Sequence, residues 1–187
     1  YESLYYNTTG TENTAVGYNA LKFNTGADNA GFGYGALTAN TSGTSNTGGG
    51  AYVLAANTTA SNNTGFGYAA LTTNTTGAAN TALGSATLYN SNSTGNTCVG
   101  YQAGYTTTYS SANVMIGYQA GGTYTGSNKL YIDNSNTSTP LIYGDFSSNA
   151  VTINGTLTPP STGTGIVQGD SEGYFYCASN GVTTVKL

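Results

Sequence analysis

The sequence lacks several residue types, and these absences exclude whole classes of function. Only 5% of the 187 residues are charged, against about 25% in a typical domain, and histidine and arginine are absent. Without them a Ser/His/Asp or Cys/His catalytic site cannot be built. The net charge is −4 and the three lysines are scattered, so binding to a nucleic-acid backbone is not expected. No apolar run approaches the roughly 18 residues that membrane insertion requires.

The few carboxylates do not form a catalytic or metal-binding motif. Paired acids for glycoside cleavage would have to come from Asp133, Asp145, Asp170 or Glu172, which all lie near predicted turns. Asp133 begins a stretch similar to a calcium loop, but the glycine and the terminal glutamate of that motif are missing. We therefore predict no enzyme, no metal and no cofactor.

Cysteine is almost absent as well. Cys98 and Cys177 stand far apart in the chain, and they form either one disulfide or two separate buried thiols. The second interpretation is favoured.

The residues that are abundant recur with a fixed period. The stretch NTAVGYNAL (residues 13–21) returns in copies that begin at Asn29, Asn46, Asn63, Asn80, Asn96 and Asn113, at steps of 16 or 17 residues. The chain also begins inside a copy, because residues 1–4 align with residues 18–21. A period this short predicts an all-β, repetitive β-solenoid rather than a disordered chain, since Tyr, Leu and Val keep fixed positions.

Each column of the repeat has a physical role. Glycine at the fifth position predicts positive φ or a close backbone approach. Apolar residues at the fourth, sixth and ninth positions favour two short strands joined by a bend, with Asn/Thr turns between copies. The glycine column comprises Gly17, Gly33, Gly50, Gly67, Gly84, Gly100 and Gly117, and the core column comprises Leu4, Leu21, Leu37, Leu54, Leu71 and Leu88.

Stacked coils would place Asn over Asn, Leu over Leu and Tyr over Tyr, with hydrogen bonds between the side-chain amides. The core of one coil is small, so the coils must stack on one another and often on other chains. We predict a homotrimer, a trimeric β-roll shaft in which the Leu and Val stripes of three chains meet at the axis.

The pattern divides the chain into three parts. Residues 1–127 are the predicted shaft, and residues 128–157 a β-rich junction or cap with strands at 129–133, 140–144 and 150–155. Residues 158–187 are a linker followed by C-terminal strands at 173–178 and 182–187. Together the last two parts would form a small C-terminal β domain.

Two sets of residues are candidates for contact with glycans. One tyrosine column would suit stacking on the sugars of a cell-surface glycan if it faced solvent, although packing between coils or between chains is the favoured role. Its members are Tyr18, Tyr34, Tyr68, Tyr101 and Tyr118. Asn-x-Ser/Thr sequons, which are glycosylation acceptors in a suitable host, occur at Asn7, Asn40, Asn57, Asn62, Asn74, Asn92, Asn136 and Asn154.

The repeat resembles the NTAVGYxAL repeats of phage tail-fibre and bacterial surface proteins. The likeness includes residues 117–121 (GYQAG) and the block formed by residues 127–134, 141–146 and 151–155, and so covers roughly residues 1–157. More loosely, it is similar to the head repeats of trimeric autotransporter adhesins. The resemblance implies a trimeric, elongated, extracellular attachment fibre; the sequence departs from the family in that no C-terminal intramolecular chaperone follows Leu187.

The sequence thus predicts a structural extracellular protein, a shaft of the phage tail-fibre type that presents attachment surfaces. One alternative is a secreted or cell-surface fibril whose subunits polymerise end to end and carry glycans. A polysaccharide-degrading tailspike is a weaker third hypothesis.

Overall fold

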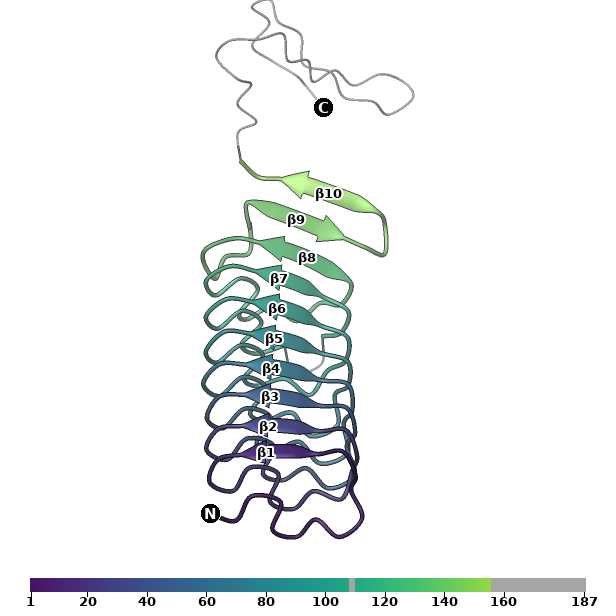
Figure 1. The fold of residues 1–187 in the computed structure, drawn as a ribbon. Coiled ribbons are helices and arrows are strands. Elements are labelled where there is room, and N and C mark those ends of the chain that lie inside the picture. Colours follow the sequence, from purple (N-terminus) through teal and green to yellow (C-terminus); the bar gives the residue numbers. More distant parts are fainter. Residues whose placement is uncertain (108–109, 156–187) are drawn as a thin grey trace, which may run out of the picture. The chain divides into compact units, whose positions relative to one another are not determined.

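Residues 1–107 and 110–155 are described by the computed structural model, and they contain strands and turns but no helix. Ten short strands form one sheet in chain order (Figure 1). The bounds are β1 Thr14–Val16, β2 Ala30–Phe32, β3 Thr47–Gly49, β4 Thr64–Phe66, β5 Thr81–Leu83, β6 Thr97–Val99, β7 Val114–Ile116, β8 Lys129–Ile132, β9 Ile142–Asp145 and β10 Ala150–Ile153. Residues 1–154 make up one compact unit. The predicted all-β solenoid is confirmed.

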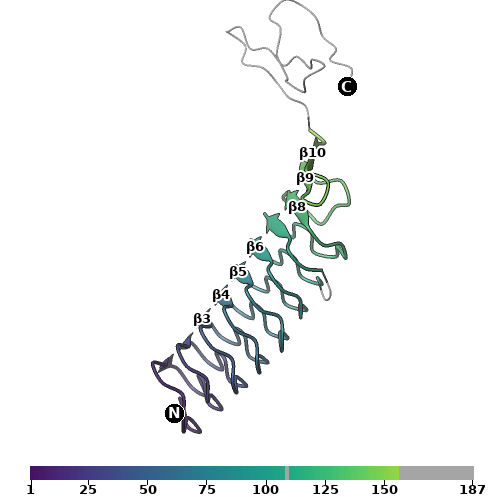
Figure 2. The same ribbon diagram turned by 90° about the vertical axis from the view of Figure 1, so that its right-hand side faces the viewer.

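Strands β1 to β8 pair in parallel, and each coil places its strand directly on the strand of the coil before (Figure 2). Strand β8 is one more parallel rung, so the stack continues past the boundary predicted at residue 127. Strands β9 and β10 then turn back antiparallel. The strands predicted at 129–133, 140–144 and 150–155 thus correspond to β8, β9 and β10, whereas residues 158–187 lie outside the described part.

Each coil contains one strand, not the two predicted. After Val16, residues Gly17, Asn19 and Leu21 all have positive φ, at 134°, 56° and 51°. Because every second residue turns left-handed, the chain curls instead of extending. Neighbouring coils still bond along this curled side, for example from the Leu21 N–H to the Ala36 carbonyl at 2.9 Å.

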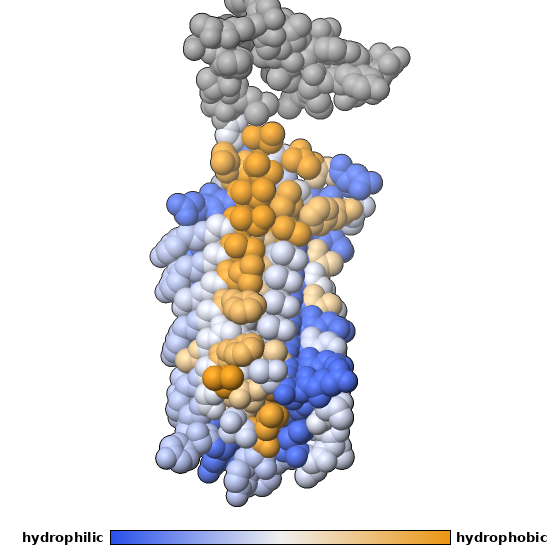
Figure 3. Space-filling model, in the orientation of Figure 1, coloured by the Kyte–Doolittle hydropathy of each residue, from blue (hydrophilic) through white to orange (hydrophobic). Residues whose placement is uncertain are grey.

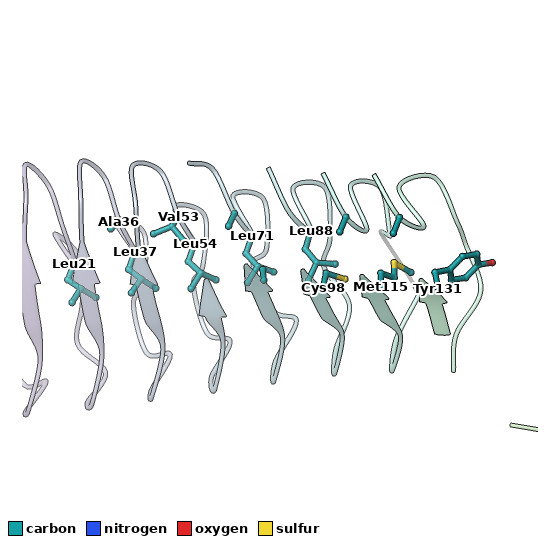
Figure 4. Close-up of a cluster of buried hydrophobic side chains, with 14 residues drawn as sticks. Leu21, Ala36, Leu37, Val53, Leu54, Leu71, Leu88, Cys98, Met115 and Tyr131 are labelled. Atoms are coloured by element: carbon teal, nitrogen blue, oxygen red, sulfur yellow. The ribbon is translucent and has the colours of Figure 1, made fainter. Parts of the chain in front are cut away.

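The core lies between the strand and the curled side of each coil. The third repeat position, such as Cys98 or Met115, faces inward from the strand, and the leucine column meets it from the other side (Figure 4). Leu21, Leu37, Leu54, Leu71 and Leu88 are each 0% exposed. The prediction that the leucine stripe meets other chains at an axis is therefore wrong, because these side chains fill the core of their own chain.

Where the repeat changes, a larger side chain on the strand side of the core is matched by a smaller one in the leucine column. In the last two copies the inward strand residues are the larger Cys98 and Met115, and the leucine column becomes Gly104 and Gly121. A Cβ on Gly121 would lie 2.6 Å from the Met115 sulfur. The two columns together keep the core filled, as close packing requires.

Candidate binding surfaces

Two ladders of buried asparagines hold the coils in register. In the first column, Asn63 accepts hydrogen bonds at Oδ1 from the backbone and the side chain of Asn80, at 3.0 and 3.1 Å. The second column links Asn24, Asn40, Asn57 and Asn74 side chain to side chain. That ladder ends at Asn74, where the next coil has Ser91, and Asn74 Oδ1 has no partner among the described residues. Asparagine is therefore a structural residue in these coils.

The ladders change the interpretation of the glycosylation sequons. Asn40, Asn57 and Asn74 are 0% exposed and donate to the carbonyl three residues ahead. The Asn7 side chain is partly buried and makes the same bond to Gly10. The four exposed acceptors are Asn62, Asn92, Asn136 and Asn154. Half of the candidate sites are thus wholly or partly buried. Three of the exposed side chains are bonded as well: Asn92 accepts from the Thr76 N–H at 2.8 Å, Asn136 accepts from the Thr123 hydroxyl at 3.1 Å, and Asn154 donates to the Pro140 carbonyl at 2.6 Å.

The outer face of the sheet carries a continuous apolar column, here called the apolar stripe. It consists of the fourth repeat position, and its members Val16, Phe32, Phe66, Leu83, Val99 and Ile116 are between 36% and 59% exposed. Figure 3 shows it as an orange band along the sheet. The strand register extends the column through Ile132, Ile142 and Ile153. Contiguous exposed apolar surfaces are, in general, common at interaction sites.

One coil lacks an apolar side chain in this column, yet the stripe is not broken there. The third copy has Gly49, and a Cβ built on it would lie within 2.4 to 2.5 Å of the Phe66 ring. The Phe66 ring therefore lies over Gly49 and covers the position where a side chain is missing.

The predicted tyrosine column is a ladder of rings that stack on one another and are also exposed. Packing between coils and contact with a glycan are therefore compatible roles for it. Tyr18 and Tyr34 stack with centroids 5.2 Å apart and planes at 16°, and Tyr101 and Tyr118 stack at 5.3 Å and 19°. Each member of the predicted column remains between 43% and 60% exposed.

The predicted column leaves out Tyr52, which the sequence shows displaced by one position in the irregular third copy. Its ring nevertheless bridges the neighbouring coils, at 5.2 Å from Tyr34 and 6.1 Å from Tyr68. Partial burial, and then Tyr34, raise the pKa of the Tyr52 hydroxyl. Tyr89 and Tyr105 form a second stack at 5.3 Å.

The Asp133 and Asp145 carboxylates stabilise the backbone and side chains close to them. Asp133 accepts hydrogen bonds from the Asn134 N–H at 2.8 Å and from the Ser135 hydroxyl at 3.0 Å. Asp145 pairs with Lys129 at 2.8 Å, across the β8–β9 ladder, and accepts from Ser147. No group of three or more His, Cys, Asp or Glu that could hold a metal occurs within residues 1–107 and 110–155. Asp170 and Glu172 lie outside the described residues.

The Lys129–Asp145 pair makes the β8–β9 hairpin sensitive to acid. The hydrogen bond from Lys129, followed by that from Ser147, lowers the pKa of the Asp145 carboxyl below its ordinary value. A lowered folded-state pKa adds stability above the unfolded carboxyl pKa of about 4, which is lost as the pH falls below it. We expect the melting temperature to fall between about pH 5 and pH 2, and to fall less in Asp145→Asn. Equal slopes in the two proteins would contradict this assignment.

Cys98 is a free thiol that is fully buried between the core columns. Burial raises its pKa well above the ordinary value, so it is held as the neutral thiol. Cys177 lies outside the described residues. The part of the chain that the structure describes also holds no apolar helix of membrane-spanning length.

Comparisons of the chain with protein-family models, with curated proteins and with solved structures found no match.

Proposed function

We propose that the protein is a structural segment of an extracellular fibre, of the phage tail-fibre type, whose copies associate side by side through the apolar stripe. The observation that carries the proposal is that stripe, an apolar column on nearly every rung of the outer face of the sheet. A chain that stacks its own coils in parallel forms a stiff shaft, which is the mechanical requirement of a fibre.

The stripe suits a small closed assembly. Each chain offers one apolar column on one face, and cyclic assembly brings such columns together at a common axis. We propose three copies, as the resemblance to the tail-fibre repeats implies. Full burial of a Phe or Ile side chain contributes roughly 1.5–3 kcal/mol, and the stripe residues, at 36–59% exposure, gain about half of that each on association.

Attachment would then work through repetition. Three identical shafts held in register present the tyrosine ladder several times at fixed spacing. Weak contacts made by each copy add through their effective concentration, and the overall affinity exceeds that of one site.

The test removes apolar area from the stripe without changing the core. Phe32 and Phe66 are 42% and 46% exposed, and neither belongs to the buried cluster. We expect Phe32→Ser/Phe66→Ser to reduce association by about a hundredfold or more, since both rings leave the interface in every copy. Light scattering should then show the 18.9 kDa single chain, where the unchanged protein shows a trimer.

Phe23→Ser is the matched control. Phe23 is 44% exposed, but it stacks on Tyr6 away from the stripe. It should leave the native mass unchanged. A wild-type protein that already runs as a single chain would refute the assembly, and an open-ended polymer would favour the end-to-end fibril instead.

A further inference from the structure

The tyrosine ladder is interrupted once, at Ser85. The fifth copy of the repeat has serine where the first, second, fourth, sixth and seventh copies have tyrosine. The third copy also lacks a tyrosine at this position, but Tyr52, one residue later, fills that place. The fifth copy has Ala86 at that next position and no such substitute. One ring is therefore missing between Tyr68 and Tyr101.

The missing ring leaves a cavity of about 520 Å³ at this point. Coils of a parallel stack are about 4.8 Å apart, so the coils of Tyr68 and Tyr101 are separated by roughly twice that spacing. Stacked rings elsewhere in the chain lie 5.2–5.3 Å apart. The gap over Ser85 consequently accommodates one flat ring in the layer where the repeat would otherwise supply its own.

Both sides of this cavity are aromatic. Tyr52, Tyr68 and Tyr101 come from the ladder, and the stacked pair of Tyr89 and Tyr105 lines it from the neighbouring column. Tyrosine offers an apolar ring face together with a hydroxyl that donates and accepts hydrogen bonds. Five such rings around one small residue make this cavity different from the rest of the ladder.

The remaining groups in the cavity are neutral and polar. Thr72, Ser85 and Gln102 line it, and no charged side chain does so among the described residues. The Gln102 Oε1 accepts a hydrogen bond from the Gln119 amide at 2.7 Å. That bond orients the Gln102 amide group and leaves its N–H donors for a ligand.

We propose that the cavity over Ser85 is a binding site for a neutral sugar ring of a glycan. A pyranose is about as thick as the missing layer, has C–H faces that pack on tyrosine rings, and carries hydroxyls at its edge for Gln102 and Thr72. The volume lies within the roughly 300–1,000 Å³ of small-molecule sites. The absence of lining charge selects neutral sugars over uronic or sialic acids. This proposal rests on the attachment role proposed above, which it makes specific.

The decisive variant is Ser85→Tyr, which restores the residue of the other copies and fills the cavity. The variant should fold, because five other copies of the repeat have tyrosine at this position: Tyr18, Tyr34, Tyr68, Tyr101 and Tyr118. Saturation-transfer NMR on the full chain would use cellobiose, lactose and N,N′-diacetylchitobiose as neutral probes, with glucuronic acid as the anionic one. We expect at least one neutral probe to bind, and its affinity to fall tenfold or more in Ser85→Tyr and in Tyr101→Ala.

Tyr18→Ala is the control, because it removes a ladder ring of 43% exposure far from the cavity. It should bind as the unchanged protein does. The proposal is overturned if no neutral probe binds, if Ser85→Tyr binds normally, or if glucuronic acid binds best. Equal losses in Tyr18→Ala and Tyr101→Ala would also overturn it, by assigning binding to the whole ladder. Native mass is measured separately, so failure of the assembly and failure of this site are distinguishable.

Discussion

Gly67→Ala is expected to cause the largest loss of stability of any single substitution considered for the shaft. Gly67 has φ +130°, a conformation that L side chains rarely adopt. A Cβ at this position would lie 2.5 Å from the carbonyl oxygen and 2.6 Å from the carbonyl carbon of Gly84 in the next coil. The colliding atoms are backbone, so relief requires the two coils to separate. Backbone strain alone contributes about 1–3 kcal/mol, and the lost contact between rungs adds to it.

The urea midpoint measured by circular dichroism tests this expectation, with Gly95→Ala as the matched control. Gly95 also has positive φ, at 73°, but the nearest atoms to an added Cβ are 3.9 Å away. Its position in other coils is occupied by Ala79 and Ala112 with φ near 56°. We expect a smaller loss in Gly95→Ala, about 1–2 kcal/mol, because only the left-handed conformation of alanine contributes to it. Equal losses in the two variants would show that close stacking of the coils is not what requires glycine.

Asn63→Ala should produce the second largest loss of stability. The Asn63 side chain is 0% exposed. It donates to the Gly77 carbonyl at 2.9 Å and accepts from the Asn80 backbone N–H at 3.0 Å. Alanine leaves the buried Asn80 N–H without a partner, at about 1–3 kcal/mol. It also removes one of the two bonds to the Gly77 carbonyl, which keeps the bond from the Asn74 amide at 2.8 Å, and the bond from the Asn80 side chain. We therefore expect a loss of roughly 2–5 kcal/mol in the free energy of unfolding.

The adjacent Asn62 provides the control for this variant. Asn62 is exposed, with φ 63°, at a position where other coils have Ala79 and Ala112. Asn62→Ala should change the urea midpoint little. If Asn63→Ala were as mild as Asn62→Ala, the amide ladder would not be a source of stability.

The repeat alone predicted the fold class and the vertical alignment of the coils. Identical residues recur at 16- or 17-residue steps, and the strand register places Ala15, Gly31 and Gly48 on successive rungs as the alignment requires. In-register stacking of like on like is the arrangement that a short exact period favours.

The position of each column around the coil was harder to predict. The leucines were assigned to a shared axis together with the fourth position, but the two columns lie on different sides of the coil wall. A strand alternates its faces, so Ala15 points inward, toward the leucines, and Val16 outward. The prediction of a second strand in each coil was wrong, because the left-handed conformation of Leu21 cannot be inferred from the residue type. The cavity over Ser85 could not be predicted from the sequence. The sequence shows that a tyrosine is missing from the column, but only the structure shows which residues of the neighbouring columns line the gap.

Disulfide cross-linking along the apolar stripe tests the central claim most directly. In a background of Cys98→Ala and Cys177→Ser, Val99→Cys places a thiol at a stripe position that is 36% exposed. Thr94→Cys places one on an exposed turn outside the stripe. If copies meet stripe to stripe, oxidation converts most Val99→Cys chains into disulfide-linked dimers and leaves Thr94→Cys chains monomeric on a non-reducing gel. Cross-linking of Thr94→Cys alone, or of neither, would contradict the assembly.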